Sequence, residues 1–225
     1  MTPSPTTAPV TDVGSMAVIH TVYRREFRLA AGLVRGVADG DVRRARVVAD
    51  HLAVVGSHLH RHHTHEDEML WPLLLQRVPD ELAPVVELME TQHRTVDALQ
   101  SEVAAVMPRW RQTARRADRE VLAELHDRLY VHLVEHLDAE EQRLLPIAAR
   151  TVTQQEWDAM AESGRTSTPR RELLLTLGLI AYEGDPDRVA GMLADAPVAV
   201  RVLLPALARR AFARHSRRVH GTATP

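Results

Sequence analysis

The residues of this sequence best able to carry chemistry are its histidines and carboxylates. The 225-residue chain contains 13 histidines and no cysteine, so thiolate metal ligands, disulfides and cysteine nucleophiles are all excluded. A histidine followed four residues later by a glutamate occurs at His62 and Glu66, and again at His136 and Glu140. An imidazole and a carboxylate one helical turn apart can bind the same metal ion. The first hypothesis is therefore a metal site.

The elements that carry these residues are predicted to be helices. Apolar residues recur with helical spacing in four long segments, and no stretch shows the sustained alternation of a strand. The four segments are residues 16–38, 41–77, 80–112 and 118–150. They are separated by Asp39-Gly40-Asp41, by Val78-Pro79-Asp80 and by an Arg-rich polar link at 112–118. Because short links make successive helices antiparallel, the sequence predicts an all-α, up-down-up-down four-helix bundle.

Each helix of this bundle presents one histidine among its core positions: His20, His62, His93 and His136. A helix rises about 1.5 Å per residue, so the distance from a turn sets the level of a side chain. His20 lies 20 residues before Gly40 and His62 lies 22 after it, a mismatch of about 3 Å. Counting residues from the other two links places Glu66, His93 and His136 at the same height along the bundle as His20 and His62. Glu140 is one turn from His136.

Six groups at one level favour a two-metal centre over ordinary core packing. A lone buried histidine is more often hydrogen-bonded to a neighbour than bound to a metal ion. Here the spacing repeats, since His20 and His62 are 42 residues apart and His93 and His136 are 43 apart. The repeat indicates two hairpins related by a pseudo-twofold axis. Burying four imidazoles and two carboxylates would be costly without metal ions to satisfy them.

The two motifs resemble those of the hemerythrin-like HHE cation-binding family. They read His58-Leu-His-Arg-His62-His-Thr-His-Glu66-Asp-Glu-Met-Leu-Trp-Pro72 and His132-Leu-Val-Glu-His136-Leu-Asp-Ala-Glu140-Glu-Gln-Arg-Leu-Leu-Pro146, and the resemblance covers about residues 16–150. It implies a hemerythrin-like bundle with two non-haem iron ions bridged by carboxylates. The ligands would be His20, His62, Glu66, His93, His136 and Glu140. The C-terminal region, with Leu177-Gly178, resembles extensions of actinobacterial members.

The sequence also departs from the oxygen-carrying members of this family, and the departure argues against simple oxygen carriage. Oxygen-carrying hemerythrins have His-x3-His on the third helix and His-x4-Asp on the fourth. In this sequence Asp97 follows His93 by four residues, and the fourth helix carries His-x3-Glu. We therefore expect a di-iron protein that binds, senses or detoxifies dioxygen, hydrogen peroxide or nitric oxide, and catalase-like or peroxidase-like activity is a close alternative to binding alone.

Further residues near the motifs have more than one interpretation. His58 and His132 each precede a predicted ligand by four residues, and each is either a seventh ligand or a proton or hydrogen-bond partner. Tyr23 is expected to be a core aromatic rather than a ligand. His63 and His65 are predicted on the outer edge of the second helix, with Glu141 beside the ligands or on the surface. An apolar wall around the centre is predicted from Phe27, Leu59, Met69, Val96 and Leu133. Structural or surface roles are expected for His51, His126, His215 and His220.

The chain is predicted to divide into a disordered leader at residues 1–15, the bundle at 16–150 and a C-terminal helical extension at 151–225. The extension should contain helices at 153–162, 169–182, 186–193 and 197–219. Neither a signal peptide nor an apolar run long enough for a membrane span is evident, so a cytoplasmic protein without membrane contact is expected.

A binding module is the alternative from a different functional class. The formal net charge is only −2, so the overall charge gives no reason to expect nucleic acid as a partner. The last predicted helix is nevertheless rich in arginine, with Arg201, Arg209, Arg210, Arg214, Arg217 and Arg218. Such a helix could contact an acidic partner or nucleic acid, although a solvated helix face is the simpler interpretation. A third interpretation is an iron-sensing domain that folds only when loaded.

Overall fold

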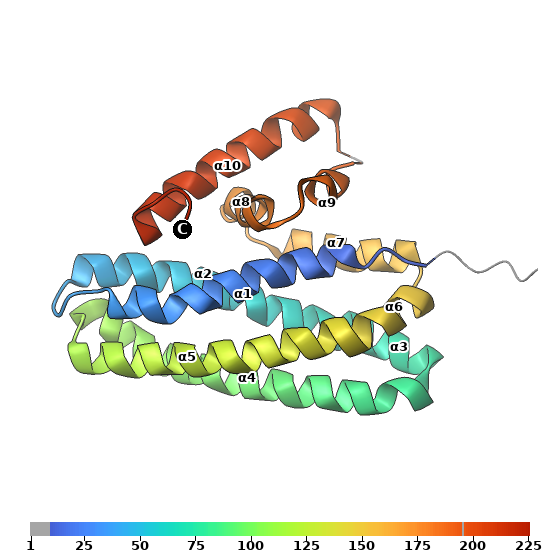
Figure 1. The fold of residues 1–225 in the computed structure, drawn as a ribbon, viewed down its shortest axis with the longest axis horizontal. Coiled ribbons are helices and arrows are strands. Elements are labelled where there is room, and N and C mark those ends of the chain that lie inside the picture. Colours follow the sequence, from blue (N-terminus) through green and yellow to red (C-terminus); the bar gives the residue numbers. More distant parts are fainter. Residues whose placement is uncertain (1–9, 195) are drawn as a thin grey trace, which may run out of the picture.

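The computed structural model describes residues 10–194 and 196–225, and this part of the chain is helical, without a strand. Four long rods form the bundle, and two of them contain a π-helical turn. The rods are α1 (Gly14–Arg35); α2 (Val42–His65) with η1 (Glu66–Leu70) and α3 (Trp71–Arg77); α4 (Pro79–Thr113); and α5 (Arg116–Ala139) with η2 (Glu140–Leu144) and α6 (Leu145–Thr151). Both α1 and α4 pack against α2 and α5. Figure 1 shows the rods side by side, so the predicted all-α bundle is confirmed.

The turn between α1 and α2 is tied to the turn between α4 and α5. Gly40 has a φ of +78°, which glycine adopts without strain, and its amide donates to the carbonyl of Ala114 at 3.1 Å. Asp41 then caps α2 by accepting a hydrogen bond from the amide of Arg44 at 2.9 Å. Because these turns meet at the same end, the two hairpins of the bundle are aligned along its axis.

The π-helical turns begin at the two glutamates of the repeated motif. The amide of Trp71 donates to the carbonyl of Glu66, and the amide of Leu145 donates to that of Glu140, five residues back in both cases. A proline, Pro72 or Pro146, follows each turn. A proline ring inside a regular helix would clash with the carbonyl four residues earlier, and a wider turn relieves that clash.

This extra residue per turn changes which side chains face the core. Leu70 and Leu74 are buried, whereas Met69 is 36% exposed. The prediction that Met69 lines the centre is therefore wrong, because it assumed regular helical spacing through the motif. Phe27, Leu59, Val96 and Leu133, the other predicted wall residues, are buried.

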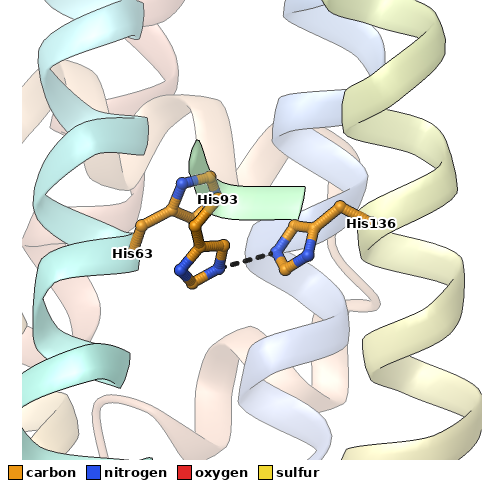
Figure 2. A group of neighbouring side chains, drawn as sticks. All are labelled: His63, His93 and His136. Carbon is orange, nitrogen blue, oxygen red and sulfur yellow. Dashed lines mark hydrogen bonds between the residues drawn. The ribbon is translucent and has the colours of Figure 1, made fainter. Parts of the chain in front are cut away.

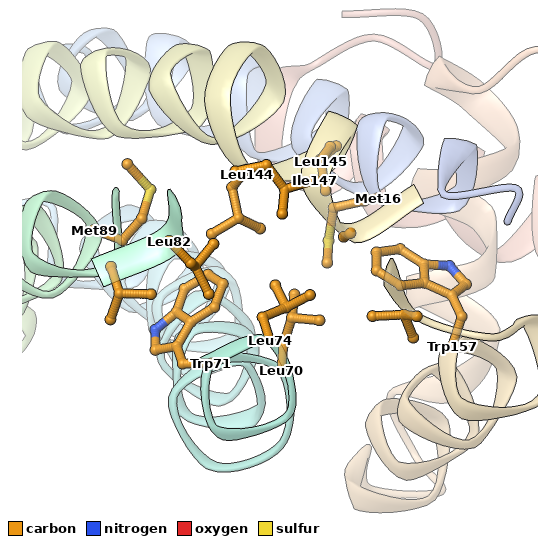
Figure 3. Packing of buried hydrophobic residues seen from close by; sticks show 13 residues of the cluster. Met16, Leu70, Trp71, Leu74, Leu82, Met89, Leu144, Leu145, Ile147 and Trp157 are labelled. Atoms are coloured by element: carbon orange, nitrogen blue, oxygen red, sulfur yellow. The ribbon is translucent and has the colours of Figure 1, made fainter. Parts of the chain in front are cut away.

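The end of the bundle beyond the π-helical turns is filled by a large apolar cluster. Figure 3 shows Leu70, Leu74 and Trp71 meeting Leu144, Leu145 and Ile147 across this space, with Trp157 at its edge. Trp157 lies on α7, so the first helix of the extension closes this end of the core. At the opposite end, Trp110 is fully buried among alanines and valines of α1 and α2.

The C-terminal extension forms a second layer over α1 and α2 (Figure 1). It comprises α7 (Gln154–Ser167), α8 (Leu173–Glu183), α9 (Pro186–Gly191) and α10 (Val198–His220). These helices confirm the four predicted ones. Gly178 lets α8 and α10 approach closely, since a Cβ there would lie 2.5 Å from the carbonyl oxygen of Ala208.

The described part of the chain starts inside the predicted leader. Residues 1–9 of that leader lie outside the described residues. Thr11, however, is buried, and its amide donates to the carbonyl of Ala149 at 2.8 Å. None of the helices in the described residues is both long enough and apolar enough to cross a bilayer.

Candidate metal centre

The structure brings the six predicted side chains together in the middle of the bundle. His20 comes from α1, His62 from α2 and His93 from α4. His136 comes from the last turn of α5, while Glu66 and Glu140 open the two π-helical turns. Five of the six are buried, and the side chain of His62 is 10% exposed. Counting residues from each turn, and converting the count to height with the helix rise, thus identified residues that lie close together.

The four imidazoles form two pairs whose Nε2 atoms face each other. His20 Nε2 lies 3.3 Å from His62 Nε2, and His93 Nε2 lies 3.2 Å from His136 Nε2. Two nitrogens bound at right angles to one ion, each at about 2.1 Å, would be about 3 Å apart. Both pairs therefore have the separation expected of two ligands of one metal ion.

The two carboxylates lie between these pairs. Glu66 Oε1 is 3.1 Å from His62 Nε2, and its Oε2 is 3.5 Å from His93 Nε2. Glu140 Oε2 is 3.2 Å from His20 Nε2 and 3.8 Å from His136 Nε2. Each carboxylate thus reaches a histidine of both pairs, which is the position of a bridging ligand.

The outer ring nitrogens of two histidines are held by carboxylates. His20 Nδ1 lies 2.8 Å from Glu141 Oε1, and His93 Nδ1 lies 3.0 Å from Asp67 Oδ1. Glu141 also accepts a hydrogen bond from Arg24 at 2.7 Å, and Asp67 accepts one from Trp71 Nε1 at 2.7 Å. A carboxylate that accepts the Nδ1–H fixes the tautomer that presents Nε2 as a lone pair.

These outer carboxylates repeat the symmetry of the motif. Asp67 directly follows Glu66, and Glu141 directly follows Glu140. Each contacts a histidine that belongs to no His-x3-Glu motif: Asp67 contacts His93, and Glu141 contacts His20. Sequence reasoning placed Glu141 near the ligands or on the surface and overlooked Asp67. The signal was the acidic residue immediately after each motif glutamate.

The charges of the cluster fit a bound cation. Among the described residues, none of the four carboxylate oxygens of Glu66 and Glu140 has a hydrogen-bond partner, although all are buried. Burial and the neighbouring Glu140 raise the pKa of Glu66 well above its usual value. Burial would also raise the pKa of Glu140, but His20 and the other imidazoles hold it low. Buried carboxylates without donors are costly, and metal ions would satisfy them.

Two of the four imidazoles, those of His62 and His136, are in the neutral form that metal ions require, whereas Glu140 and Glu141 outweigh burial at His20 and raise its pKa. Burial lowers the pKa of His136 to about 3 and that of His62 well below 6.5. Both rings are therefore neutral near pH 7, with a free lone pair on one nitrogen. Neutral nitrogen donors and carboxylate oxygens, without thiolate, suit iron, manganese or zinc.

His63 lies inside the bundle, so its predicted position on the outer edge of α2 is wrong. Its ring stacks on His93, with centroids 4.0 Å apart and planes 11° from parallel, and meets His136 edge-on (Figure 2). Consecutive helical residues are about 100° apart, so a wide inner face can bury both His62 and His63. Neither ring nitrogen of His63 has a hydrogen-bond partner among the described residues.

Of the remaining candidates, His58 and His132 lie away from the six clustered side chains, whereas the Tyr23 ring lies beside His62, with centroids 5.2 Å apart. His58 Nε2 is 3.1 Å from Glu172 Oε2 at the start of α8, and His132 is 43% exposed on its side chain, with Nδ1 3.3 Å from Glu135 Oε2. Tyr23 is a buried aromatic, as expected, and its hydroxyl donates to the carbonyl of His58 at 3.2 Å. The structure therefore brings neither His58 nor His132 into the cluster.

Comparison with known proteins bears on the same residues. Residues 13–148 match the family model described as "Hemerythrin HHE cation binding domain". This match spans more than half of the chain and includes all six clustered residues, while α7 to α10 lie beyond it. Neither a curated protein nor a solved structure matched the chain.

Proposed function

The chain belongs to the hemerythrin HHE cation-binding family, and we propose that its buried centre holds two iron ions that bind or react with dioxygen, hydrogen peroxide or nitric oxide. The observation that carries this proposal is the set of four unpartnered carboxylate oxygens of Glu66 and Glu140, which face the Nε2 atoms of four histidines. A cation-binding family and an unsatisfied buried donor set lead to the same conclusion.

Two ions, rather than one, account for the way the donors are arranged. The His20–His62 pair and the His93–His136 pair each have the spacing of ligands to one ion. Glu66 directs one oxygen to each pair. A single ion would leave one histidine pair and part of each carboxylate unsatisfied in the core. The resemblance to hemerythrin-like proteins favours iron among the metals that this donor set could bind.

When bound, two such ions supply redox chemistry and open positions for small ligands. The protein orients the donors, since Asp67 and Glu141 hold His93 and His20 with Nε2 toward the centre. Phe27, Leu59, Val96 and Leu133 are buried together in one apolar cluster, on the four helices that carry the six residues. Burial of the donors excludes bulky organic substrates, whereas diatomic molecules and peroxide are small enough to enter.

His63 is the residue best placed to handle a proton. It stacks on His93 within the core, and burial lowers its pKa well below 6.5, so its ring is neutral near pH 7. A neutral imidazole with no other partner has one N–H to donate and one lone pair to accept a proton. We assign to His63 the proton role considered for His58 and His132.

The test is metal analysis with optical spectroscopy of the purified protein. We expect about two irons per chain, the occupancy of a bridged pair, and a spectrum that changes with oxygen, peroxide or nitric oxide. One ring nitrogen each of His63, His93 and His136 lies within 4.8 Å of the others, so His63→Leu separates two roles of His63. Unchanged iron with a slower peroxide reaction supports the proton role, whereas loss of iron would show that His63 is a ligand. Iron near zero after iron-supplemented expression would contradict the proposal.

Binding, turnover and sensing can be separated with the same sample. Steady oxygen release from peroxide indicates catalase-like turnover, whereas a single spectral change without release indicates a binding or sensing site. If the metal-free protein is unfolded at growth temperature, iron sensing through folding is favoured instead. A melting curve of the metal-free protein measures this directly.

The arginines of α10 support a second, weaker candidate function. All six are exposed, and among the described residues none forms an ion pair with a carboxylate. Such a face could bind an acidic partner or nucleic acid. If so, DNA affinity should fall steeply with salt and should vanish when the arginines are replaced by glutamine. An unreactive iron centre together with DNA binding at physiological salt would favour this function over the first.

A further inference from the structure

A second buried cluster of histidines lies where the C-terminal extension meets the bundle. Glu26 comes from α1 and His51 from α2, while His215 and His220 come from the last two turns of α10. His51 is central to it, with Nε2 2.9 Å from Glu26 Oε2 and Nδ1 3.1 Å from His215 Nε2. The ring of His220 meets His51 edge-on, with centroids 5.6 Å apart.

Three of these residues offer donors to a common point. One ligand atom each from Glu26, His51 and His220 lies within 4.8 Å of the others. Glu26 and His51 are almost completely buried, at 1% and 3% exposure. Although Glu26 Oε2 and His51 Nε2 are close, neither atom has a partner with hydrogen-bond geometry among the described residues. Close approach without a hydrogen bond is what two ligands of one ion would show.

The neighbouring guanidinium groups are already engaged. Arg25 pairs through Nη1 with Glu26 Oε1 and through Nε with Glu183 Oε1 at 2.8 Å. Among the described residues, its Nη2 has no hydrogen-bond partner, and no guanidinium group is hydrogen-bonded to Glu26 Oε2. Arg44 donates to the carbonyl of Arg218 at 2.8 Å and also to that of Val219, at the end of α10. The carboxylate oxygen that faces His51 thus lacks a cation of its own.

The protonation states also suit a metal ion. Burial would raise the pKa of Glu26, but His51 and Arg25 lower it, so the carboxylate is ionised near pH 7. Burial lowers the pKa of His215 and of His220 to about 4, so both rings are neutral. Neutral imidazole and ionised carboxylate are the forms that bind divalent transition metals.

We propose that Glu26, His51 and His220 form a second metal site, for a single divalent ion such as Zn²⁺, which fastens the end of α10 to the bundle. Two imidazole nitrogens and one carboxylate oxygen are a known three-ligand set for zinc, with a water as the fourth ligand. His215 is a positioning residue, because with an ion on His51 Nε2 the Nδ1–H of His51 would donate to His215 Nε2, 3.1 Å away, and so hold the His51 ring in place.

This site would change how firmly the extension is held. α10 packs mainly against α8. It contacts the bundle through Phe212, which packs with Val22 of α1, and through its C-terminal end, where Arg44 of α2 donates to the carbonyl of Arg218. An ion shared by α1, α2 and α10 would join three elements that are far apart in the sequence. Metal availability would then set how often α10 separates from the bundle.

The experiment is a Zn²⁺ or Co²⁺ titration of full-length protein whose bundle centre is already filled with iron. We expect one further equivalent to bind, and Co²⁺ to give the visible absorption of a four-coordinate site. His220→Gln should abolish this binding without changing the iron content, and the exposed His132→Gln is the matched control. His215→Ala should weaken binding by about 10- to 100-fold.

Limited proteolysis provides a second measurement. Zn²⁺ should slow cleavage within α10 of the wild-type protein and have no effect on the His220→Gln variant, whose side chain lies at the helix end and should leave the fold intact. The proposal is overturned if no additional ion binds or if His220→Gln binds it equally well. Iron is measured in the same samples, so failure of this site is distinguishable from failure of the iron centre.

Discussion

The two hairpins of the bundle carry the same motif but meet different surroundings. In both, a histidine, a glutamate one turn later, a π-helical turn and an acidic residue after the glutamate converge on the centre. Their outer faces differ, because the C-terminal helices cover α1 and α2. His58 is therefore paired with Glu172 of the extension, whereas His132, at the matching place in α5, is exposed.

The same contrast holds deeper in the core. His63 follows His62 and is buried beside the ligands, while Leu137 occupies the matching position after His136. His51, eleven residues before His62, has partners on α1 and α10. His126, ten residues before His136, is buried with neither ring nitrogen partnered among the described residues. The two hairpins thus share the residues of the proposed metal centre. The contacts of their other histidines differ, because the segments packed against each hairpin differ.

The largest expected effect tests whether the two halves are equivalent. Glu66→Ala and Glu140→Ala should each lose both irons, because each carboxylate reaches a histidine of both pairs. Glu68→Ala is the control, since Glu68 is exposed and should keep the full iron content. Iron per chain is the measurement. Retention of one iron in either variant would contradict the bridging assignment and show that the halves act separately.

The second prediction tests the register that the π-helical turns impose on both hairpins. Leu70→Ala and Leu144→Ala should each lower the free energy of unfolding by about 2–5 kcal/mol, because both side chains are fully packed. Met69→Ala should change it by less than about 1 kcal/mol, since Met69 is partly exposed. Urea unfolding of the metal-free variants measures both. A larger loss for Met69 than for Leu70 would contradict the observed register.

The third prediction concerns the outer carboxylates. Asp67→Ala and Glu141→Ala should each weaken iron affinity by about 10- to 100-fold without removing a ligand, because His93 and His20 lose the partner that orients them. Competition with a chelator measures the affinity. Asp67→Asn and Glu141→Gln keep an acceptor oxygen and should lose less. Unequal losses from the two sites would show that Trp71 and Arg24 support them differently.

The smallest expected effect compares two buried histidines, His126 without a hydrogen-bond partner among the described residues and His51 with one. Burial lowers the folded-state pKa of His126 to about 4, below its unfolded value of 6.5. Between pH 6.5 and 4, His126 is therefore protonated more readily in the unfolded chain than in the folded one. The stability of the protein that depends on neutral His126 is complete above pH 6.5 and is lost as the pH falls toward 4. His126→Leu should therefore stabilise the protein by about 1 kcal/mol at pH 7 and more at pH 5.

His51→Leu is the matched variant in the first hairpin. It should destabilise the protein at pH 7, because the buried Glu26 carboxylate would lose a partner. Thermal unfolding of both variants across pH 4–7 measures the difference. The two substitutions should change stability in opposite directions at pH 7. A change in the same direction would mean that the two positions are not distinguished by their surroundings.

Helical periodicity and helix rise were sufficient to predict the bundle and the meeting of six side chains. The predicted segments 41–77 and 118–150 correspond to two of the observed rods within two residues at each end. His20 and His93, which belong to no local motif, were identified because a regular helix relates sequence distance to height. These properties are local, so they can be derived without knowing which helices pack together.

Two things decided the rest: the local effect of proline on the helix, and tertiary packing. Proline after each motif widened one turn, and this moved Leu70 into the core in place of Met69. His63 became buried because α2 has neighbours on both flanks, and His58 turned toward Glu172 because α8 covers that face. Asp67 and Glu141 gained their role by reaching histidines on other helices. Periodicity indicates which face of a helix is apolar, but the partner of each polar side chain depends on contacts between segments distant in the sequence.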